Sequence, residues 1–175
     1  KRMNRIIRIP MIAGGNVKRQ EDVKKILYAG AKRAILNFSK QDSPKLMEDA
    51  AKRFGKEKIA VSLHDFDALF KHQHKIEECC GEIVFMHRLD LDSVMNVTDI
   101  PCVILTDTMD ERELFKILKC PGVKGLSGQY VSRTDMDLST FKEKCTAQDI
   151  KMTSFESIME FSQFKTNEQG LIPVV

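Results

Sequence analysis

One stretch of the sequence decides the fold class: residues 9–31 read IPMIAGGNVKRQEDVKKILYAGA. Ile9–Ala13 is a short apolar run, which predicts a strand, and two glycines end it. Lys18–Ala29 has apolar residues at helical spacing, which predicts an amphipathic helix that stops at Gly30. A strand, a glycine turn and a helix in this order are typical of a βα unit in a parallel sheet.

The same alternation continues along the chain. Further strands are expected at Arg33–Asn37, Lys58–Leu63, Glu82–Met86, Cys102–Leu105 and Gly122–Leu126. Helices are expected at Ser43–Phe54, Lys71–Glu78, Glu111–Lys119 and Leu138–Ala147. This pattern gives six βα units of roughly 24 residues each, whereas a closed eight-unit barrel needs about 250 residues. The predicted fold class is therefore α/β, a (βα)8 TIM-type barrel with about six of its βα units in this chain.

An internal repeat supports this fold. Residues 9–12 (IPMI) recur as residues 100–103 (IPCV), and the helix-like residues 21–27 recur as 113–118. The offset is about 91 residues, or four βα units. A half-barrel duplicated within eight strands gives this spacing, with the first visible strand as number three and its repeat as number seven.

Composition excludes several classes of protein. The chain has 175 residues, 42% of them hydrophobic and 30% charged, as in an ordinary globular protein. No apolar run approaches the roughly 18 residues of a membrane span. The 28 basic and 25 acidic residues are interspersed, so no nucleic-acid footprint is expected. Five cysteines, an odd number, indicate reduced thiols and a cytoplasmic location rather than a disulfide framework.

The residues around the first two strands also resemble one family of barrels. The stretch at residues 9–31, Asn37 in the run RAILNFS, and Arg53-Phe54-Gly55 are similar to the histidine-biosynthesis (βα)8 barrels. These are the cyclase subunit of imidazole glycerol phosphate synthase and phosphoribosylformimino aminoimidazole carboxamide ribotide isomerase. The resemblance covers about residues 5–145. It implies a ribulose-phosphate-binding type of barrel, a phosphorylated ribotide as ligand, and a glutaminase as a candidate partner.

The resemblance also implies a phosphate site at the carboxyl ends of the strands. The candidate phosphate-binding residues are Gly14, Gly15, Asn16, Asn37, Ser127 and Gly128. Glycine lets the backbone approach a phosphate closely, and a following helix supplies partial positive charge. The family has a third glycine where Asn16 stands, and asparagine also adopts the left-handed conformation. A strand-to-helix turn without any ligand is the alternative interpretation.

The second phosphate half-site of such barrels follows strand seven, where the family has another glycine pair. This chain has Thr106-Asp107-Thr108 there. Asp107 brings a negative charge to a place meant for an anion, which opposes phosphate binding. We interpret this half-site as degenerate.

Catalysis in the resembled enzymes uses two carboxylates, on strands one and five, as general acid and base. Strand one is not in this chain. On strand five His64 stands where the family has its aspartate, and Asp65 follows it. A one-residue bulge would bring Asp65 into position, or His64 itself would act as a base. The alternative is two ordinary polar residues at the end of a strand.

No metal or other cofactor is expected in this chain. His72, His74, Cys79 and Cys80 invite a zinc hypothesis, but their spacing matches no common structural zinc pattern. An exposed polar helix is the preferred interpretation. Arg88 is a candidate for neutralising a ligand phosphate, with a solvated loop arginine as the alternative.

The last part of the chain has a different character. Phe161–Lys165 and Gln169–Val175 resemble the opening of phosphoribosyl-AMP cyclohydrolase. We therefore expect a barrel at residues 1–149 and, at residues 150–175, a linker with the start of a cyclohydrolase-like domain. Such fusions commonly continue into a phosphoribosyl-ATP pyrophosphatase, which makes a multifunctional enzyme. The zinc ligands and catalytic residues of the hydrolase would lie beyond Val175.

Two functions remain open from the sequence. In the first, the barrel is a degenerate phosphate-binding or scaffold domain of the fused histidine-biosynthesis enzyme, and this chain alone is inactive. In the second, it is an active cyclase or isomerase that acts on a phosphoribosyl aminoimidazole carboxamide ribotide by acid–base catalysis. In both, six strands leave open sheet edges, so a partner chain or a homo-oligomer is expected to cover them.

Overall fold

The computed structural model describes residues 10–38, 43–86, 98–128, 130, 137–152, 164–167 and 170–173. Six parallel strands form one sheet in the order β1-β2-β3-β4-β5-β6. The strands are β1 (Ile12–Gly14), β2 (Arg33–Asn37), β3 (Ile59–Leu63), β4 (Glu82–Phe85), β5 (Cys102–Thr106) and β6 (Val123–Gly128). The helices are α2 (Gln20–Tyr28), α3 (Ser43–Phe54), the 3-10 helix η1 (Lys56–Lys58), α4 (Phe66–Cys79), α6 (Glu111–Lys119) and α8 (Leu138–Thr146).

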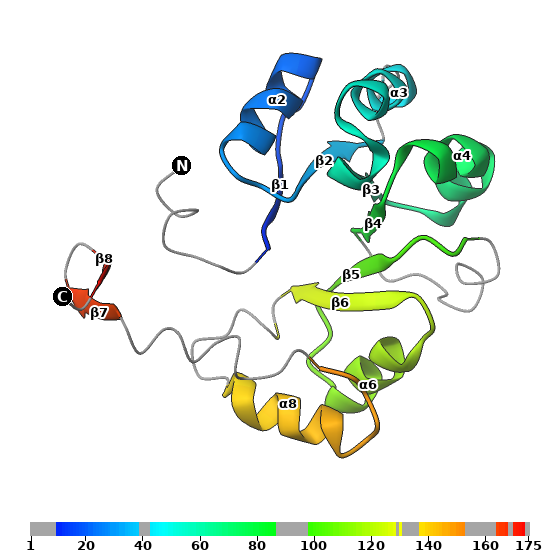
Figure 1. The fold of residues 1–175 in the computed structure, drawn as a ribbon. Helices are drawn as coiled ribbons and strands as arrows, with labels where there is room; N and C mark the ends of the chain where they lie inside the picture. The colour runs from blue at the N-terminus through cyan, green and yellow to red at the C-terminus, as the bar shows by residue number, and fades with distance from the viewer. Residues whose placement is uncertain are drawn as a thin grey trace.

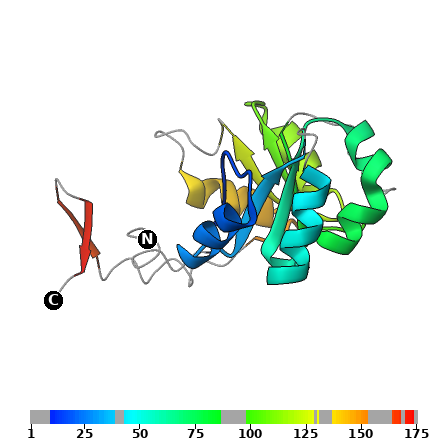
Figure 2. The same cartoon turned by 90° about the horizontal axis from the view of Figure 1, so that it is seen from above.

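The sheet curls into part of a barrel. Figure 1 shows the six strands following one curve, with the helices along its outer side. Figure 2 shows the same strands and their helices from above. This arrangement confirms the predicted fold class, a partial (βα)8 TIM-type barrel with six strands.

Several predicted elements match closely, and others differ for local reasons. β2, α3 and α6 have the predicted bounds. α4 begins five residues earlier than predicted, at Phe66, because the Asp65 carboxylate accepts a hydrogen bond from the Ala68 N–H at 2.7 Å and caps the helix. β6 extends to Gly128, beyond its predicted end at Leu126.

The predicted repeat corresponds to two matching helices. α2 and α6 are each nine residues long, and their first residues, Gln20 and Glu111, are 91 positions apart. The capping positions Arg19 and Asp110 have the same offset. The β1–α2 and β5–α6 units are therefore structurally equivalent.

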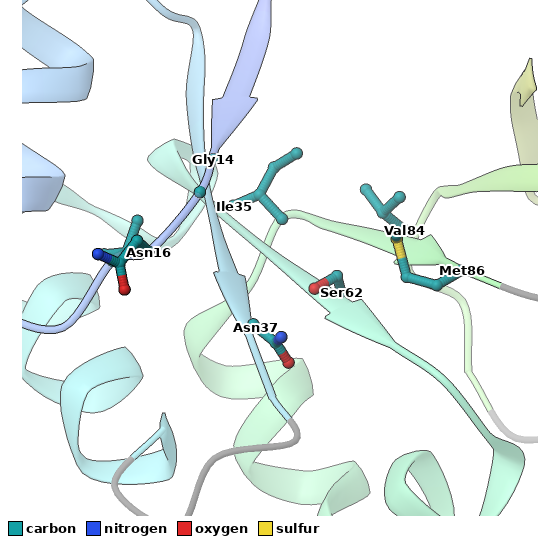
Figure 3. Close-up of a pocket in the computed structure, with 9 residues that line it drawn as sticks. Gly14, Asn16, Ile35, Asn37, Ser62, Val84 and Met86 are labelled. Atoms are coloured by element: carbon teal, nitrogen blue, oxygen red, sulfur yellow. The ribbon is translucent and has the colours of Figure 1, made fainter.

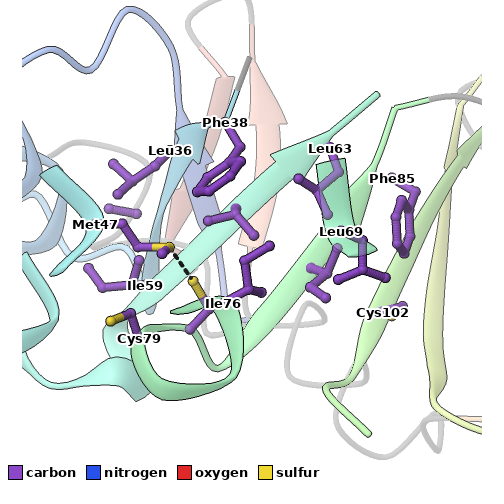
Figure 4. Close-up of a cluster of buried hydrophobic side chains, with 14 of the residues drawn as sticks. Leu36, Phe38, Met47, Ile59, Leu63, Leu69, Ile76, Cys79, Phe85 and Cys102 are labelled. Atoms are coloured by element: carbon purple, nitrogen blue, oxygen red, sulfur yellow. Dashed lines mark hydrogen bonds between the residues drawn. The ribbon is translucent and has the colours of Figure 1, made fainter. Parts of the chain in front are cut away.

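The main core lies between the sheet and its helices. Figure 4 shows this cluster, in which Leu36 and Ile59 from the strands meet Met47 from α3 and Ile76 from α4. The Cys80 thiol donates a hydrogen bond to the Met47 sulfur at 3.1 Å. Because Leu36 faces the helices, strand alternation turns its neighbours toward the inner face of the curled sheet.

That inner face carries an ion pair near the amino-terminal ends of the strands. The Arg33 and Glu82 side chains lie 2.9 Å apart and are only 17% and 11% exposed. They come from β2 and β4, and the small residue Ala60 on β3 lies between these strands. The ion pair occupies the interior at the amino-terminal ends of the strands. The carboxyl ends of the strands therefore remain available for a ligand site.

A second cluster joins α6 and α8. It contains Phe115 from α6, Phe141 from α8, and Ile150, which follows α8. Ile150 lies at the predicted boundary between the two parts of the chain, and that boundary stays a prediction.

The end of the described chain is an antiparallel hairpin of β7 (Phe164–Asn167) and β8 (Gly170–Pro173). No ladder joins it to the six-stranded sheet in the part of the chain described. Asn167 and Gly170 form the last pair of the hairpin. None of the described helices is long and apolar enough to cross a membrane.

Candidate functional site

A cavity of about 290 Å³ lies at the carboxyl ends of the first four strands (Figure 3). Its lining residues are Gly14, Gly15, Asn16, Val17, Ile35, Asn37, Ser62, Val84 and Met86. Four of the predicted phosphate-binding residues therefore lie together: Gly14, Gly15, Asn16 and Asn37. Ligand sites of TIM-type barrels lie at this end of the sheet, where strand-to-helix loops meet.

Strand register explains why these side chains converge. Gly14 on β1 pairs with Ile35 on β2, and Asn37, two residues further, pairs with Ser62 on β3. Ser62 also pairs with Val84 on β4. Since alternate residues of a strand share one face, these positions all face the interior of the curled sheet.

The turn after β1 depends on glycine at two positions. A Cβ atom on Gly14 would lie 2.8 Å from the Cβ of Ile35, so no larger residue fits beside β2. Gly15 has a φ of 126° with open space where its Cβ would be, and Asn16 has a φ of 49°. Asn16 thus adopts the left-handed conformation expected for it. Successive residues in such conformations turn their N–H groups toward a common side, which suits an anion.

The residues that follow this turn carry balanced charge, with Lys18 and Arg19 against Glu21 and Asp22. Lys18 and Arg19 are exposed, and their backbone N–H groups donate to the Asp22 carboxylate at 3.2 and 3.1 Å. The backbone hydrogen bond from Lys18, followed by that from Arg19, lowers the pKa of Asp22 against the opposing effect of desolvation. Because Asp22 already occupies the start of α2, an anion would be held by the turn itself.

Ser62 is a site residue that the sequence analysis missed. Its side chain is 7% exposed and lines the cavity. In Figure 3 its hydroxyl and the Asn37 amide both project into the space between β2 and β3. Among the described residues no protein group hydrogen-bonds to that hydroxyl. Its place in the cavity depends on the pairing of β3 with β2 and β4, which the sequence alone does not give.

The two predicted catalytic residues lie just beyond β3. Asp65 caps α4 through the Ala68 N–H, and His64 is exposed directly after the strand. Neither is among the residues that line the cavity. Their proposed roles in acid–base catalysis stay predictions.

Ser127 and Gly128 end β6, the strand at the opposite edge of the sheet from β1. They are not among the residues that line the cavity either. A Cβ atom on Gly128 would lie 1.8 Å from the Thr106 carbonyl oxygen, so glycine is needed there for the close approach of β5. Their assignment to a phosphate also stays a prediction.

The turn after β5 is built from polar side chains that bond to one another. The Thr108 hydroxyl donates to the Glu113 carboxylate at 2.6 Å. The Thr106 hydroxyl accepts from the Thr108 N–H at 3.2 Å, and Asp110 accepts from the Arg112 N–H at 2.9 Å. The backbone donors of this turn thus have acceptors within the turn.

The histidine and cysteine group is spread over α4 and its end. The His72 ring packs edge-on against Phe38, with ring centroids 5.1 Å apart, and His74 pairs with Glu78 at 3.4 Å. Cys79 and Cys80 are buried, and desolvation raises the pKa of both thiols. Within the described ranges, no three such side chains are grouped to hold a metal ion. Arg88 lies outside the described residues.

The matches with known proteins include a family model and a curated relative. A family model described as "Histidine biosynthesis protein" matches residues 1–105 of this chain. Imidazole glycerol phosphate synthase subunit HisF of Buchnera aphidicola subsp. Acyrthosiphon pisum (strain APS) is 28% identical over 83 residues. That alignment covers 47% of this chain and 32% of the Buchnera protein, so it spans about a third of the relative's length.

Proposed function

The chain belongs to the histidine biosynthesis protein family, and from this premise we propose that its barrel binds a phosphorylated ribotide through the β1–α2 turn. The observation that carries the proposal is the cavity, because it brings Gly14, Gly15, Asn16 and Asn37 together at the carboxyl ends of the strands. The positive φ of Gly15 and Asn16 supplies backbone geometry that suits a phosphate, and the Lys18 and Arg19 side chains are exposed beside the turn.

The role we favour for this domain is phosphate binding or scaffolding within a larger histidine-biosynthesis enzyme. Two observations favour that role over complete catalysis. Asp65 is engaged as the cap of α4, and the turn after β5 has Thr106-Asp107-Thr108 where the resembled family has a glycine pair. A carboxylate fixed at a helix start has its acceptor oxygen occupied and is poorly placed to exchange protons with a ligand.

The alternative is an active cyclase or ribotide isomerase. His64 favours it, since a histidine exposed at the end of β3 is a suitable general base near neutral pH. Turnover of a phosphoribosyl aminoimidazole carboxamide ribotide that is abolished by His64→Gln would establish this alternative. Absence of turnover by a polypeptide that also carries barrel strands one and two would rule this alternative out.

The wider context of the domain is also a proposal. The similarity of the segment at residues 150–175 to a cyclohydrolase supports a fused, multifunctional hydrolase, and hydrolysis of phosphoribosyl-AMP by the whole polypeptide tests it. A glutaminase partner is supported by the name of the Buchnera relative. A partner or second copy is supported by the open edges at β1 and β6. No disulfide joins any of the five cysteines, which favours a cytoplasmic location.

Calorimetric titration with a phosphoribosyl aminoimidazole carboxamide ribotide tests the proposed site. We expect binding in the micromolar range, about −8 kcal/mol, and a loss of at least about tenfold in Gly15→Ala. The added methyl has space, but an alanine at φ 126° forces the turn to change its conformation.

The matched control is Gly30→Ala, at the other end of α2. Gly30 has a similar φ of 102°, so its replacement causes comparable backbone strain away from the cavity. Unchanged affinity in Gly30→Ala and weakened affinity in Gly15→Ala is the expected pair of results. No binding by the unaltered chain up to millimolar ribotide would remove the proposal.

A further inference from the structure

We infer that the site engages only one phosphomonoester group of its ligand, and that the barrel holds no second phosphate after β5. This inference rests on the proposed function and defines its substrate class. It follows from a comparison of the two equivalent turns, β1–α2 and β5–α6, whose helices have the same length and are 91 positions apart.

The equivalent positions carry opposite chemistry. Gly15 corresponds to Thr106 and Asn16 to Asp107, so the open glycine of the first turn is replaced by a buried threonine. Arg19 corresponds to Asp110, so the capping position changes from a basic to an acidic residue. The first turn is suited to an anion, and the second repels one.

Three N–H groups of the second turn, those of Thr108, Asp110 and Arg112, already have side-chain acceptors. Thr106 and Thr108 accept hydrogen bonds from the N–H groups of Thr108 and Asp110 at 3.2 and 3.3 Å. The Asp110 carboxylate accepts from Arg112 at the start of α6, where an incoming phosphate would otherwise bind. In the first turn Asp22 occupies the donors at the helix start in a similar way, so the difference between the two turns lies at Gly15 and Asn16.

The end of β6 leaves no room beside this turn. The Gly128 backbone lies so close to Thr106 that even a Cβ atom would collide with the Thr106 carbonyl oxygen. Ser127 and Gly128 therefore serve the packing of β6 on β5 in this inference, and they are set aside as phosphate ligands.

The cavity has the size and polarity for the rest of a small phosphomonoester. Its volume of about 290 Å³ lies near the lower limit of ligand pockets, roughly 300 Å³. Ser62, a buried residue that lines the cavity, is on β3, two strands from the glycine turn on β1. Two strand spacings are about 10 Å, which a pentose phosphate spans with its phosphate at the turn and a hydroxyl at Ser62.

Calorimetric titration of the full chain with two probes, each alone and then in competition with the other, tests the inference at physiological salt. The probes are ribose 5-phosphate and ribose 1,5-bisphosphate. We expect one molecule of either probe per chain, with dissociation constants within about threefold of each other, since the second phosphate finds no donors. Gly15→Ala is expected to lower the affinity for both probes by the same factor, because both bind to the same turn.

Other results would overturn the inference in distinguishable ways. Binding of the bisphosphate about tenfold tighter or more, or bisphosphate binding that survives Gly15→Ala, would demonstrate a second phosphate site and leave the proposed function standing. Amide shifts at Thr108 and Asp110 on adding the bisphosphate would lead to the same conclusion. Failure of both probes and of the carboxamide ribotide to bind would remove the inference and the proposed function together.

Discussion

Asp65 and His64 are adjacent, but at the scale of single residues only one of them has a defined structural task. The Asp65 carboxylate accepts the Ala68 N–H at 2.7 Å, which satisfies one of the donors at the start of α4. A hydrophobic stretch follows at once, so the cap fixes where the strand stops and the helix starts. Sequence alone could not assign this task, because an aspartate after a strand fits a cap and a catalytic acid equally well.

Replacement of Asp65 separates these two tasks. Asp65→Ala is expected to lower the free energy of unfolding by about 1 kcal/mol, since the cap is lost. Asp65→Asn is expected to stay within about 0.5 kcal/mol of the unaltered chain, because asparagine also caps helices. Urea unfolding followed by circular dichroism measures both. A large loss in Asp65→Asn would show that the charge, and not the cap, is what this position requires.

At the scale of elements, α8 is held to the barrel through aromatic packing on α6. The Phe115 and Phe141 rings stack with centroids 5.8 Å apart, and Tyr130 lies 5.2 Å from Phe141. The Tyr130 hydroxyl and the Lys144 ammonium both bond to the Glu111 carboxylate, at 2.6 and 2.9 Å. These contacts make α6 and α8 one packing unit with its own small core.

Truncation of Phe141 should therefore loosen this unit. The side chain is 4% exposed, so Phe141→Ala is expected to cost about 3–5 kcal/mol. Leu138→Ala, in the same helix but 46% exposed, is the control and should cost less than about 1 kcal/mol. Urea denaturation gives both values. Equal losses in the two variants would contradict the packing described for α8.

The elements that sequence analysis predicted well are those with clear start and stop residues. α3 begins at Ser43-Pro44 and ends before Gly55, and both signals act locally. The bounds of β6 were harder to predict from the sequence. The pairing of β6 with β5 shifts register between Cys102 and Val103 of β5, and such a shift is a tertiary feature. The bounds of β7 depend in the same way on its pairing with β8.

At the scale of the whole molecule, acid stability depends on carboxylates distributed around the barrel. Hydrogen bonds from Lys18, Lys75, Tyr130 and Thr140 are the leading causes that lower the pKa values of Asp22, Glu48, Glu111 and Asp137, respectively. A lowered pKa in the folded state means that the stabilisation is complete above the unfolded values of 3.8 and 4.5 and is lost as pH falls through the folded ones.

We therefore expect the melting temperature to fall as the pH drops below about 4.5, without a corresponding loss from these groups between pH 5 and 8. Asp137→Asn should make the acid limb shallower, because asparagine retains the cap of α8 but does not titrate there. Asp67→Asn, an exposed position in α4, is the comparison variant. Thermal melts at a series of pH values distinguish them, and identical acid limbs in all three chains would contradict this account.

Only part of the candidate site could be predicted from the sequence. The glycine turn could be identified because its conformational needs are local. Ser62, Val84 and Met86 could not, because they join the cavity only when β3 and β4 pair in register beside β2. Sequence patterns indicate which residues are inside a strand, but not which neighbours complete a pocket.

The most direct measurement of the central claim is a two-dimensional 1H–15N NMR titration of the chain with ribose 5-phosphate. The account predicts saturable shifts centred on the amides of Gly14, Gly15 and Asn16, with smaller changes at Asn37 and Ser62. Thr106, Asp107 and Thr108 should stay unchanged. Shifts centred on the turn after β5, or no saturable shift at millimolar ligand, would contradict the placement of a phosphate site at the β1–α2 turn.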